Sequence, residues 1–279
     1  MTISVIGLGL IGGSFAQDLR QAGLASRLIG VDISNEHALR ARALGLVEEV
    51  LSLSEALRVS DVVVLATPVG AIATLLPDIL NDIGPEQTVI DLGSTKGEIA
   101  QIVREHVNRA RYVAAHPMAG TENAGPEAAM VGLFKGKTVL LCDLELSAPD
   151  ACKIALEIFH AVGLKFEFMT SLQHDRHTAY VSHLAHVVAY ALALTVQAEE
   201  KIGGTVPRWA GSGLTSTVRL AKSPAAMWTP ILQQNREEIL RAVDAFAEQL
   251  QFFRQCLVKE DYACLNQLIR EANQIRDLL

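Results

Sequence analysis

A glycine pattern near the amino terminus restricts the fold more than any other feature of this chain. Gly7, Gly9 and Gly12 follow the β-branched run 3–6 and open a helical pattern over 11–22, which stops before Gly23. Between a strand and a helix, such glycines permit a tight turn, close approach of a ligand to the backbone, and close packing of the helix on the strand. The pattern therefore predicts the first β-α unit of a nucleotide-binding sheet.

The first 170 residues continue this alternation of short apolar runs and helical patterns. Strands are expected at 3–6, 28–31, 61–66, 88–91, 112–114, 138–142 and 165–168, and helices at 11–22, 35–44, 72–80, 96–109 and 149–162. Strands that alternate with helices form mostly parallel, doubly wound sheets. We therefore expect a Rossmann-type α/β domain.

The pattern changes after Ser171, where no convincing strand remains. Helices are expected at 174–201, at 223–255 as one or two elements, and at 259–279. We place a domain boundary near residue 170, which gives a dinucleotide-binding domain over 1–170 and an all-α substrate and dimerisation domain over 171–279. A long apolar helix in such a domain often forms the core of a dimer.

Charge and composition narrow the possible partners and compartment. The net charge is −7 and no basic patch stands out, which argues against nucleic acid or anionic membrane as partners. The longest apolar stretch, 184–196, is too short to span a bilayer, and no basic residue precedes Arg20 as a signal peptide would need. The four cysteines form no C-x-x-C pair and read as thiols in a reducing compartment. A soluble cytoplasmic protein is expected.

The glycine turn and the second strand indicate which cofactor binds. The helix amino terminus offers free N–H groups and partial positive charge to phosphates. Asp32 ends the second strand twenty residues after Gly12, where a carboxylate accepts hydrogen bonds from a ribose and repels a 2′-phosphate. No arginine follows directly, so NAD is favoured over NADP, and a ligand-free glycine turn is the alternative. The expected cofactor-binding residues are Gly7, Leu8, Gly9, Leu10, Ile11, Gly12, Asp32, Thr67 and Pro68.

Ligands of open α/β sheets bind outside the carboxyl ends of the strands, so the residues that follow each strand are candidates for chemistry. Ser94 follows the strand 88–91, and His116 follows 112–114. An imidazole titrates near neutral pH and suits the removal of a proton from an alcohol, while Ser94 could hydrogen-bond the same hydroxyl. The structural alternatives are a loop histidine and a helix N-cap, with Thr95 and Glu98 as a capping box.

The helical half adds polar candidates among apolar residues. They are Asp175, His177, His183, His186 and Arg219. His183 and His186 share a helix face, but no carboxylate or cysteine nearby completes a metal site, so we expect no metal. Arg219 stands among small and apolar residues, where a substrate carboxylate could pair with it; an internal salt bridge or an exposed arginine is the alternative.

Taken together, these segments resemble the prephenate/arogenate dehydrogenase family of tyrosine biosynthesis, most closely its monofunctional members that act on prephenate. The matching segments are 7–12, Asp91-Leu92-Gly93-Ser94-Thr95-Lys96, His116-Pro117-Met118-Ala119-Gly120-Thr121, His174-Asp175, Ser182-His183-Leu184-Ala185-His186, and Ser212-Gly213 through Arg219 to Trp228. They run nearly the whole length of the chain, and the blocks at 116–120 and 182–184 are the specific ones.

The resemblance implies an NAD-dependent oxidative decarboxylation of prephenate to 4-hydroxyphenylpyruvate by a homodimer. It implies that hydride leaves C4 of the ring while His116 takes the hydroxyl proton, and that Ser94 holds both the hydroxyl and His116. Arg219 would bind a substrate carboxylate, and Thr121 would lie on the substrate side. His186, oriented by Asp175, would lie near the substrate.

One segment departs from the family pattern and leaves the substrate open. Many members have Phe, a basic residue and Asp where this chain has Leu214, Thr215 and Ser216. Glu122 would then lack its basic partner, and a free carboxylate could meet the amine of arogenate. Arogenate dehydrogenase is thus an alternative. Two further alternatives are another 3-hydroxy acid dehydrogenase, which would typically use a lysine that 174–200 lacks, and a catalytically silent NAD-binding sensor.

Overall fold

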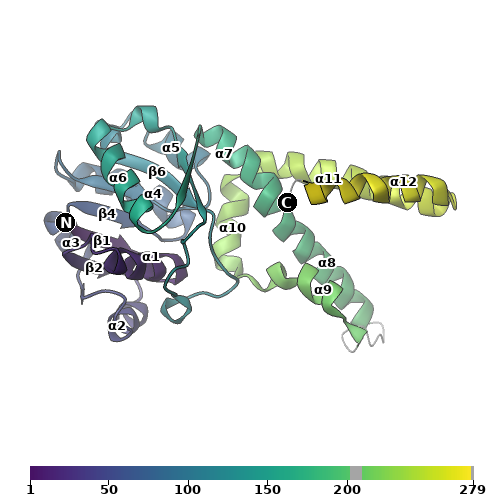
Figure 1. Cartoon of the computed structure of the whole chain (residues 1–279), viewed down its shortest axis with the longest axis horizontal. Coiled ribbons are helices and arrows are strands. Elements are labelled where there is room, and N and C mark those ends of the chain that lie inside the picture. The colour runs from purple at the N-terminus through teal and green to yellow at the C-terminus, as the bar shows by residue number, and fades with distance from the viewer. Residues whose placement is uncertain (202–208, 278–279) are drawn as a thin grey trace.

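The computed structural model, which describes residues 1–201 and 209–277, contains an eight-stranded sheet in its amino-terminal part (Figure 1). The strands are β1 Thr2–Ile6, β2 Arg27–Val31, β3 Glu49–Val50, β4 Val62–Leu65, β5 Thr88–Asp91, β6 Tyr112–Pro117, β7 Thr138–Cys142 and β8 Lys165–Met169. Their order is β3-β2-β1-β4-β5-β6-β7-β8. The first six are parallel, and β7 runs antiparallel to β6. The expected Rossmann-type, mostly parallel sheet is confirmed, with the 3-2-1-4-5-6 order of that fold.

Helices cover both faces of this sheet, as a doubly wound fold requires. They are α1 Leu10–Gln21, α2 Asn35–Ala43, α3 Leu53–Val59, α4 Val69–Asp82, α5 Gly97–Ile102 and α6 Pro149–Ala161. On one face α1 and α6 meet through Phe15 and Phe159, which are fully buried with ring centroids 6.0 Å apart. The core of the other face is supplied by α3, α4 and α5. The strands between them are buried on both sides and therefore read as continuous apolar runs.

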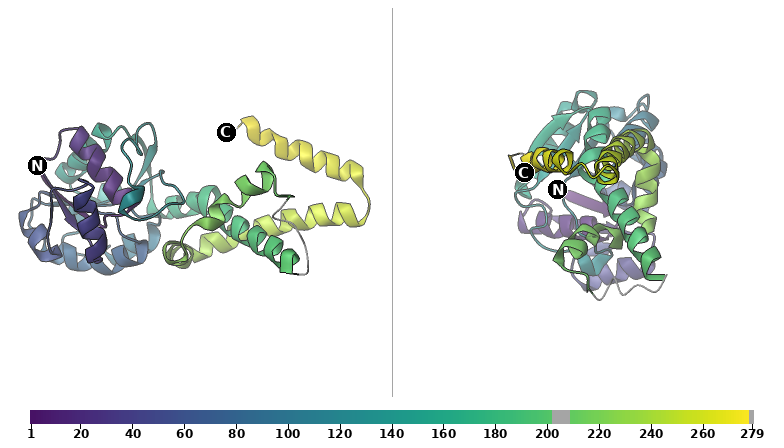
Figure 2. Two further views of the ribbon diagram at one scale, coloured as in Figure 1. Left: turned by 90° about the horizontal axis from the view of Figure 1, so that it is seen from below. Right: turned by 90° about the vertical axis from the view of Figure 1, so that its right-hand side faces the viewer.

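The carboxyl-terminal part is helical over the described residues. One continuous helix of 31 residues, Ser171–Lys201, consists of α7 Ser171–Thr178, a π turn Ala179–His183 and α8 Leu184–Lys201. The remaining helices are α9 Ser212–Thr217, α10 Ala225–Gln234, α11 Arg236–Val258 and α12 Tyr262–Ala272. Trp228 and Ile231 of α10 join the core beside α4, so α10 attaches the helices to the sheet domain. Figure 2 shows α11 and α12 projecting away from the sheet.

One predicted helix is too long, and two short elements were not predicted. The helix expected at 96–109 ends at Ile102, because the following turns are held by other contacts, such as Asn108 Nδ2 donating to the Leu80 carbonyl at 2.8 Å. The strand β3 has only two residues and gives no periodic signal. Helix α3 was missed although Ser52 and Glu55 form a capping box at its start. The last two residues of the helix expected at 259–279 lie outside the described part.

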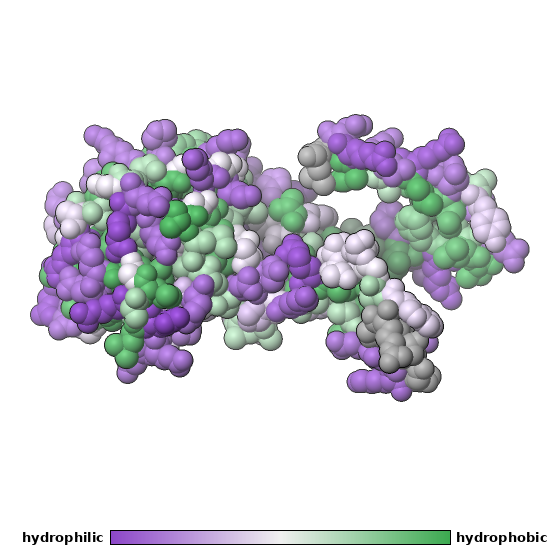
Figure 3. Space-filling model, turned by 60° about the horizontal axis from the view of Figure 1, so that its bottom comes forward, coloured by the Kyte–Doolittle hydropathy of each residue, from purple (hydrophilic) through white to green (hydrophobic). Residues whose placement is uncertain are grey.

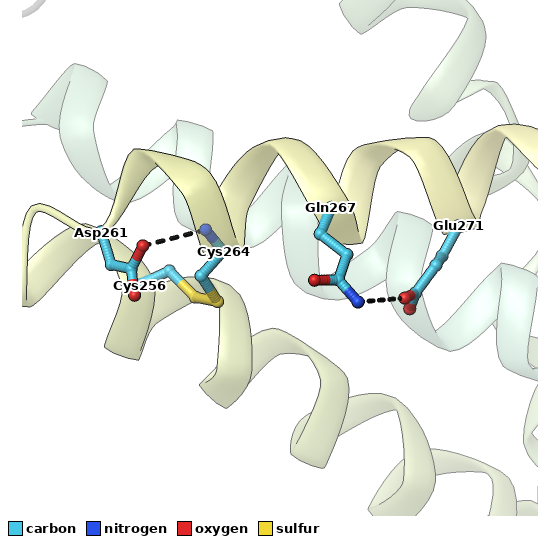
Figure 4. Close-up of a disulfide and its surroundings, with 5 residues drawn as sticks. All are labelled: Cys256, Asp261, Cys264, Gln267 and Glu271. Atoms are coloured by element: carbon cyan, nitrogen blue, oxygen red, sulfur yellow. Dashed lines mark hydrogen bonds between the residues drawn. A yellow bond between two sulfur atoms is a disulfide. The ribbon is translucent and has the colours of Figure 1, made fainter.

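Two of the four cysteines are not thiols, which corrects the sequence expectation. Cys256 at the end of α11 and Cys264 in α12 form a disulfide, with their Cα atoms 6.2 Å apart (Figure 4). The two lie eight residues apart, and the turn between the helices, with Glu260 at φ 55°, brings them together. Cys142 and Cys152 are free thiols, and burial raises the pKa of Cys142 to about 12.

The long helix is also more extended than the sequence suggested. The helix that contains the apolar stretch 184–196 continues in both directions, and an 18-residue window of Ser171–Lys201 reaches a mean hydropathy of 1.5. By length and composition alone this helix could cross a membrane, contrary to the sequence expectation, and only 17% of that window is buried within one chain. A large apolar surface of the helix therefore remains to be covered.

Candidate active site

The turn between β1 and α1 has the geometry of a phosphate-binding loop. Gly7 has φ +94°, and a Cβ there would lie 2.7 Å from the Ala66 carbonyl oxygen. A Cβ at Gly12 would lie 1.9 Å from the Gly7 carbonyl oxygen, so close packing excludes any side chain at either position. A Cβ at Gly9 would meet open space. The turn is therefore tightly packed at Gly7 and Gly12, whereas Gly9 faces open space.

The open side of this turn has the donors and acceptors that a dinucleotide needs. Gly9 is the N-cap of α1, which has neither a side-chain cap nor an acidic residue in its first turn, so its free N–H groups can bind phosphate. Asp32 lies beside the turn and accepts the Leu8 N–H at 2.9 Å, with lone pairs left for ribose hydroxyls. The Thr67 hydroxyl is buried without a hydrogen-bond partner. These groups fit the predicted NAD.

The other residues predicted to bind the cofactor differ in which of their atoms a ligand can reach. The side chains of Leu8 and Leu10 are buried in the protein, so only their main chains are available to a ligand. Ile11 packs against the core beside α1. Pro68 is exposed and is the N-cap of α4. It follows the carboxyl end of β4, the strand next to β1.

His116 stands at the carboxyl end of β6 and belongs to a chain of hydrogen bonds. Its Nδ1 lies 2.8 Å from His174 Nε2, and His174 Nδ1 lies 2.8 Å from Asp175 Oδ1. Asp175 also accepts the N–H groups of Lys96 and Gly97, each at 2.8 Å. His174 is fully buried and Asp175 nearly so, while the His116 ring keeps a partly exposed edge. The two halves of the chain thus meet at this relay.

The electrostatics of the relay keep both imidazoles neutral. Burial lowers the pKa of His116 well below its ordinary value, and the charges of His174 and Lys96 lower it further. Burial also lowers the pKa of His174, although its hydrogen bond to Asp175 opposes this. Burial alone would raise the pKa of Asp175, but the bonds from His174, Lys96 and Gly97 hold it below the ordinary value. Asp175 is therefore ionised beside two neutral histidines.

Asp175 does not orient His186, as the resemblance had implied. Its carboxylate instead accepts the first N–H groups of α5, a role that sequence analysis gave to a cap at Ser94 with Thr95 and Glu98. Thr95 Oγ1 donates to Gln234 Oε1 rather than capping the helix. Ser94 is half-buried near the end of β5, and among the described residues neither His116 nor any other group hydrogen-bonds its hydroxyl. The expected Ser94–His116 contact is replaced by His116–His174.

A second buried cluster supports the strand ends beneath the relay. Lys96 Nζ donates to Asp91, and both side chains have no exposed surface. The Tyr112 hydroxyl also donates to Asp91, and Gly93 N–H donates to it at 2.7 Å. A buried ion pair of this kind persists only when its remaining lone pairs are satisfied, as they are here. Asp91 at the end of β5 thereby connects Tyr112 of β6 with Lys96 at the amino terminus of α5.

Arg219 reaches from the helical part to the loop after β6. Its Nη1 donates to Glu122 Oε2 at 2.9 Å, so Glu122 is not the free carboxylate that sequence analysis expected. The missing basic residue at Thr215 is replaced by Arg219 itself. Both side chains are partly exposed, so the pair is weak and open to competition from an anion. Thr121, next to Glu122, is half-buried and accepts the Asn123 N–H at 3.2 Å.

Two further histidines gather around Trp228. The His186 ring stacks on the indole with centroids 3.5 Å apart, and the edge of His183 approaches it at 5.8 Å. The π turn Ala179–His183 precedes His186, and one extra residue in a helix rotates everything after it by about 100°. His174 and His186 are twelve residues apart and would otherwise diverge by about 120°; the π turn reduces this to about 20°. His177, by contrast, is exposed.

Metal binding finds no support in the part of the chain that the structure describes. No group of three or more His, Cys, Asp or Glu side chains there could hold an ion. His183 Nδ1 lies 3.1 Å from the Asn235 amide nitrogen, and His186 donates its Nδ1–H to the Ser182 carbonyl at 3.0 Å. The histidines are engaged with protein groups instead.

Sequence reasoning missed some of the residues that build the site. His174 was quoted only as part of a matching segment, and its contact with His116 is not encoded by spacing because 58 residues separate the two. The adjacent Asp175 was the available hint, since an Asp beside a His often fixes its tautomer. Asn235, which contacts both Asp175 and His183, carried no sequence signal at all.

The Rossmann-type sheet, its open glycine turn and a neutral imidazole at the neighbouring strand end define a dinucleotide-dependent dehydrogenase. Family models agree with this class and specify it. Residues 15–168 match "Prephenate dehydrogenase, nucleotide-binding domain", and 170–271 match "Prephenate dehydrogenase, dimerization domain". The chain belongs to the prephenate dehydrogenase family.

Individual relatives cover nearly the entire chain. Prephenate dehydrogenase of Bacillus subtilis is 30% identical over 99% of this chain and 75% of its own length. The structure of prephenate dehydrogenase from Aquifex aeolicus in complex with hydroxyphenyl propionate and NAD+ is 29% identical, with a TM-score of 0.89 over 99% of this chain and 97% of that one. Synechocystis arogenate dehydrogenase is 26% identical, with a TM-score of 0.78 over 99% of each chain.

Proposed function

We propose that the protein catalyses the oxidative decarboxylation of prephenate to 4-hydroxyphenylpyruvate in tyrosine biosynthesis. NAD is the cofactor, and it supplies the hydride acceptor when bound. The observation that carries the proposal is the relay from Asp175 through His174 to His116, which makes a neutral base at the strand end next to the dinucleotide turn. The proposal assigns His116 and Ser94 to chemistry and Arg219, Thr121 and His186 to the substrate.

The relay determines which nitrogen of His116 is the base. Ionised Asp175 can only accept, so the proton of His174 lies on Nδ1 and leaves Nε2 as an acceptor. The bond between His174 Nε2 and His116 Nδ1 then requires the proton on His116 Nδ1. His116 Nε2 is left with a lone pair. An imidazole held in one tautomer by a carboxylate is the arrangement that general bases use in serine hydrolases.

The chemical step needs one base and no further acid. His116 Nε2 takes the proton of the 4-hydroxyl as hydride leaves C4. The bond between the ring and its carboxylate breaks, carbon dioxide departs, and the bonding electron pair completes the aromatic ring as a phenolate. The phenolate takes the proton back from His116, which gives the 4-hydroxyl of the product and restores the neutral base. Positive charge on His116 is stabilised through His174 by Asp175. Ser94, with no partner among the described side chains, is available to hold the hydroxyl oxygen.

Arg219 supplies the cation for a substrate that carries two carboxylates. The charge of its guanidinium contributes to lowering the pKa of His186, so the two groups are close enough to interact. A carboxylate of prephenate would exchange with Glu122 for Arg219, because a partly exposed pair gains only about 0–1 kcal/mol. Until a substrate carboxylate binds, Glu122 is paired with Arg219 and is not the free carboxylate that an amine would meet.

The test is direct turnover with each substrate and cofactor. Purified protein is mixed with NAD or NADP and with prephenate or arogenate, and the absorbance of the reduced cofactor is followed. Prephenate with NAD should give the highest kcat/KM. Faster turnover of arogenate would assign the arogenate reaction instead. Preference for NADP would refute the role of Asp32, and no turnover in any mixture would refute the proposal.

We further propose a cytoplasmic homodimer in which the helical domains pair. The helix Ser171–Lys201 leaves most of its apolar window uncovered, and the space-filling view shows more apolar surface on the projecting arm (Figure 3). Large apolar side chains exposed on that arm are Leu250, Phe252, Leu257, Val258, Tyr262 and Ile269. A second copy fits this surface better than lipid, because the same helix carries buried His174 and Asp175 bound to the sheet domain. Light scattering after gel filtration should give twice the chain mass of 30.1 kDa; a monomer would refute this.

A further inference from the structure

Asn235 occupies the junction of α10 and α11 and is not part of any motif that the function used. Its side chain is 3% exposed. The amide Nδ2 donates to the Asp175 carbonyl oxygen at 2.7 Å and lies 3.1 Å from His183 Nδ1. One amide thus connects the residue that anchors the relay to a second buried imidazole.

The hydrogen bonds of this amide fix the protonation of His183. A carbonyl oxygen can only accept, so the atom facing Asp175 must be the amide nitrogen and not its oxygen. The second N–H of the same nitrogen then points to His183 Nδ1, which must carry a lone pair. The proton of the neutral ring is therefore on Nε2. Burial, which lowers the pKa of His183 to about 4, keeps the ring neutral.

The surroundings of His183 lack an acceptor for this proton. Among the described residues, no group hydrogen-bonds His183 Nε2. The Trp228 ring lies with its centroid 5.8 Å from that of His183, and its Nε1 is buried without a partner. A buried donor without a partner is unfavourable, and a bound ligand removes this penalty when it brings an oxygen. The buried indole N–H of Trp228, together with the unbonded Nε2–H of the adjoining His183 ring, indicates that this wall of the site is completed by substrate.

We propose that Asn235 is a positioning residue that holds His183 as the Nε2–H tautomer, and that His183 donates this hydrogen bond to an oxygen of the bound substrate. The inference rests on the proposed function. In this arrangement the two imidazoles have opposite roles. His116 is held by Asp175 with its Nε2 as an acceptor, whereas His183 is held by Asn235 with its Nε2 as a donor.

The tautomer is tested without any substrate. Protein labelled with ¹⁵N-histidine is examined by long-range ¹H–¹⁵N NMR, and the His183 signal is assigned from its loss in His183→Gln. The unmodified chain should show the proton on Nε2. In Asn235→Asp, whose carboxylate only accepts, the proton should move to Nδ1. A proton on Nδ1 in the unmodified chain would overturn the proposal. This readout is independent of turnover, so it separates a wrong tautomer from a wrong reaction.

The substrate contact is tested by a double-mutant cycle. Asn235→Ala should lower kcat/KM for prephenate about tenfold, the equivalent of one hydrogen bond, and leave the KM for NAD unchanged. In a His183→Gln background the loss should largely vanish, because a glutamine amide donates without help from Asn235. Equal losses in both backgrounds would show a merely structural role and overturn the proposal. Asn108→Ala is the matched control: it removes an amide bond to a carbonyl far from the site and should leave kinetics unchanged. If Asn235→Ala does not fold, the tautomer measurement on the unmodified chain still decides.

Discussion

Replacing Asp175 with Asn tests the relay at its anchor. The carboxylate accepts three hydrogen bonds at 2.8 Å, from His174 Nδ1, Lys96 N–H and Gly97 N–H. An asparagine has one oxygen, so its NH₂ must replace either Oδ1, which faces both His174 and Lys96, or Oδ2, which faces Gly97. If the NH₂ faces His174, the His174 proton moves to Nε2, and the proton of His116 then moves to its own Nε2. His116 would lose the lone pair that accepts the substrate proton.

The size of the effect follows from the bonds that are lost. Loss of a general base lowers kcat by about 10²–10⁴, which corresponds to about 3–5.5 kcal/mol of barrier. If the NH₂ faces Gly97 instead, the helix loses one charge-assisted bond, which is worth about 1.5–3 kcal/mol of stability. Asp175→Asn should therefore reduce turnover strongly and stability moderately.

Steady-state reduction of NAD with prephenate measures the first effect, and urea unfolding measures the second. Asp143→Asn is a matched control, because the nearly buried Asp143 also accepts a backbone N–H, from Ser171 at 2.9 Å, without touching an imidazole. It should lose stability with little change in kcat. A folded Asp175→Asn enzyme with the kcat of the unmodified chain would refute the reasoning.

Three further predictions follow from burial, charge and space. The pKa of His183 in the folded chain, about 4, lies below its ordinary 6.5, so the unfolded chain takes up the proton at higher pH. The free energy of unfolding is therefore highest above pH 6.5 and falls by about 3 kcal/mol by pH 4. Urea unfolding from pH 7 to 4 should show this loss, and His183→Gln should lessen it; equal slopes would contradict it. Arg219→Gln should raise the KM for prephenate about 10–100-fold, as a lost charged contact predicts, with the KM for NAD unchanged; an unaltered prephenate KM would remove Arg219 from the site. Gly12→Ala should destabilise the fold, since its Cβ would lie 1.9 Å from a carbonyl oxygen. Gly9→Ala, whose Cβ would meet open space, should leave thermal unfolding unchanged and weaken NAD binding. The opposite pattern would place the cofactor elsewhere.

The sheet was predictable because its signals are local. Each parallel strand is buried on both faces and reads as an apolar run, and the glycine turn fixes where the first helix begins. The strand β3 and helix α5 were predicted poorly for the opposite reason. A strand of two residues, as β3 is, is too short to show a periodic pattern of apolar residues. The end of α5 depends on contacts of the following turns with residues such as Leu80 on α4.

The site was predictable only in part, because its contacts join distant segments. His116 and Arg219 could be chosen from residue type and position, since strand ends and isolated cations are where chemistry is expected. Their partners could not. The contacts His116–His174 and Asn235–His183 span 58 and 52 residues, and the π turn that aligns the histidines leaves no periodic mark in an apolar helix. The Cys256–Cys264 bond likewise depends on how α12 folds back.

The most direct test of the account is the rate of NAD reduction by His116→Asn with prephenate, measured beside the NAD affinity of the same variant. An asparagine at this position retains polarity and approximate size but cannot take a proton from the substrate. The account requires cofactor binding to persist while turnover falls by at least about a hundredfold. Turnover near that of the unmodified enzyme would contradict the claim that this imidazole is the base.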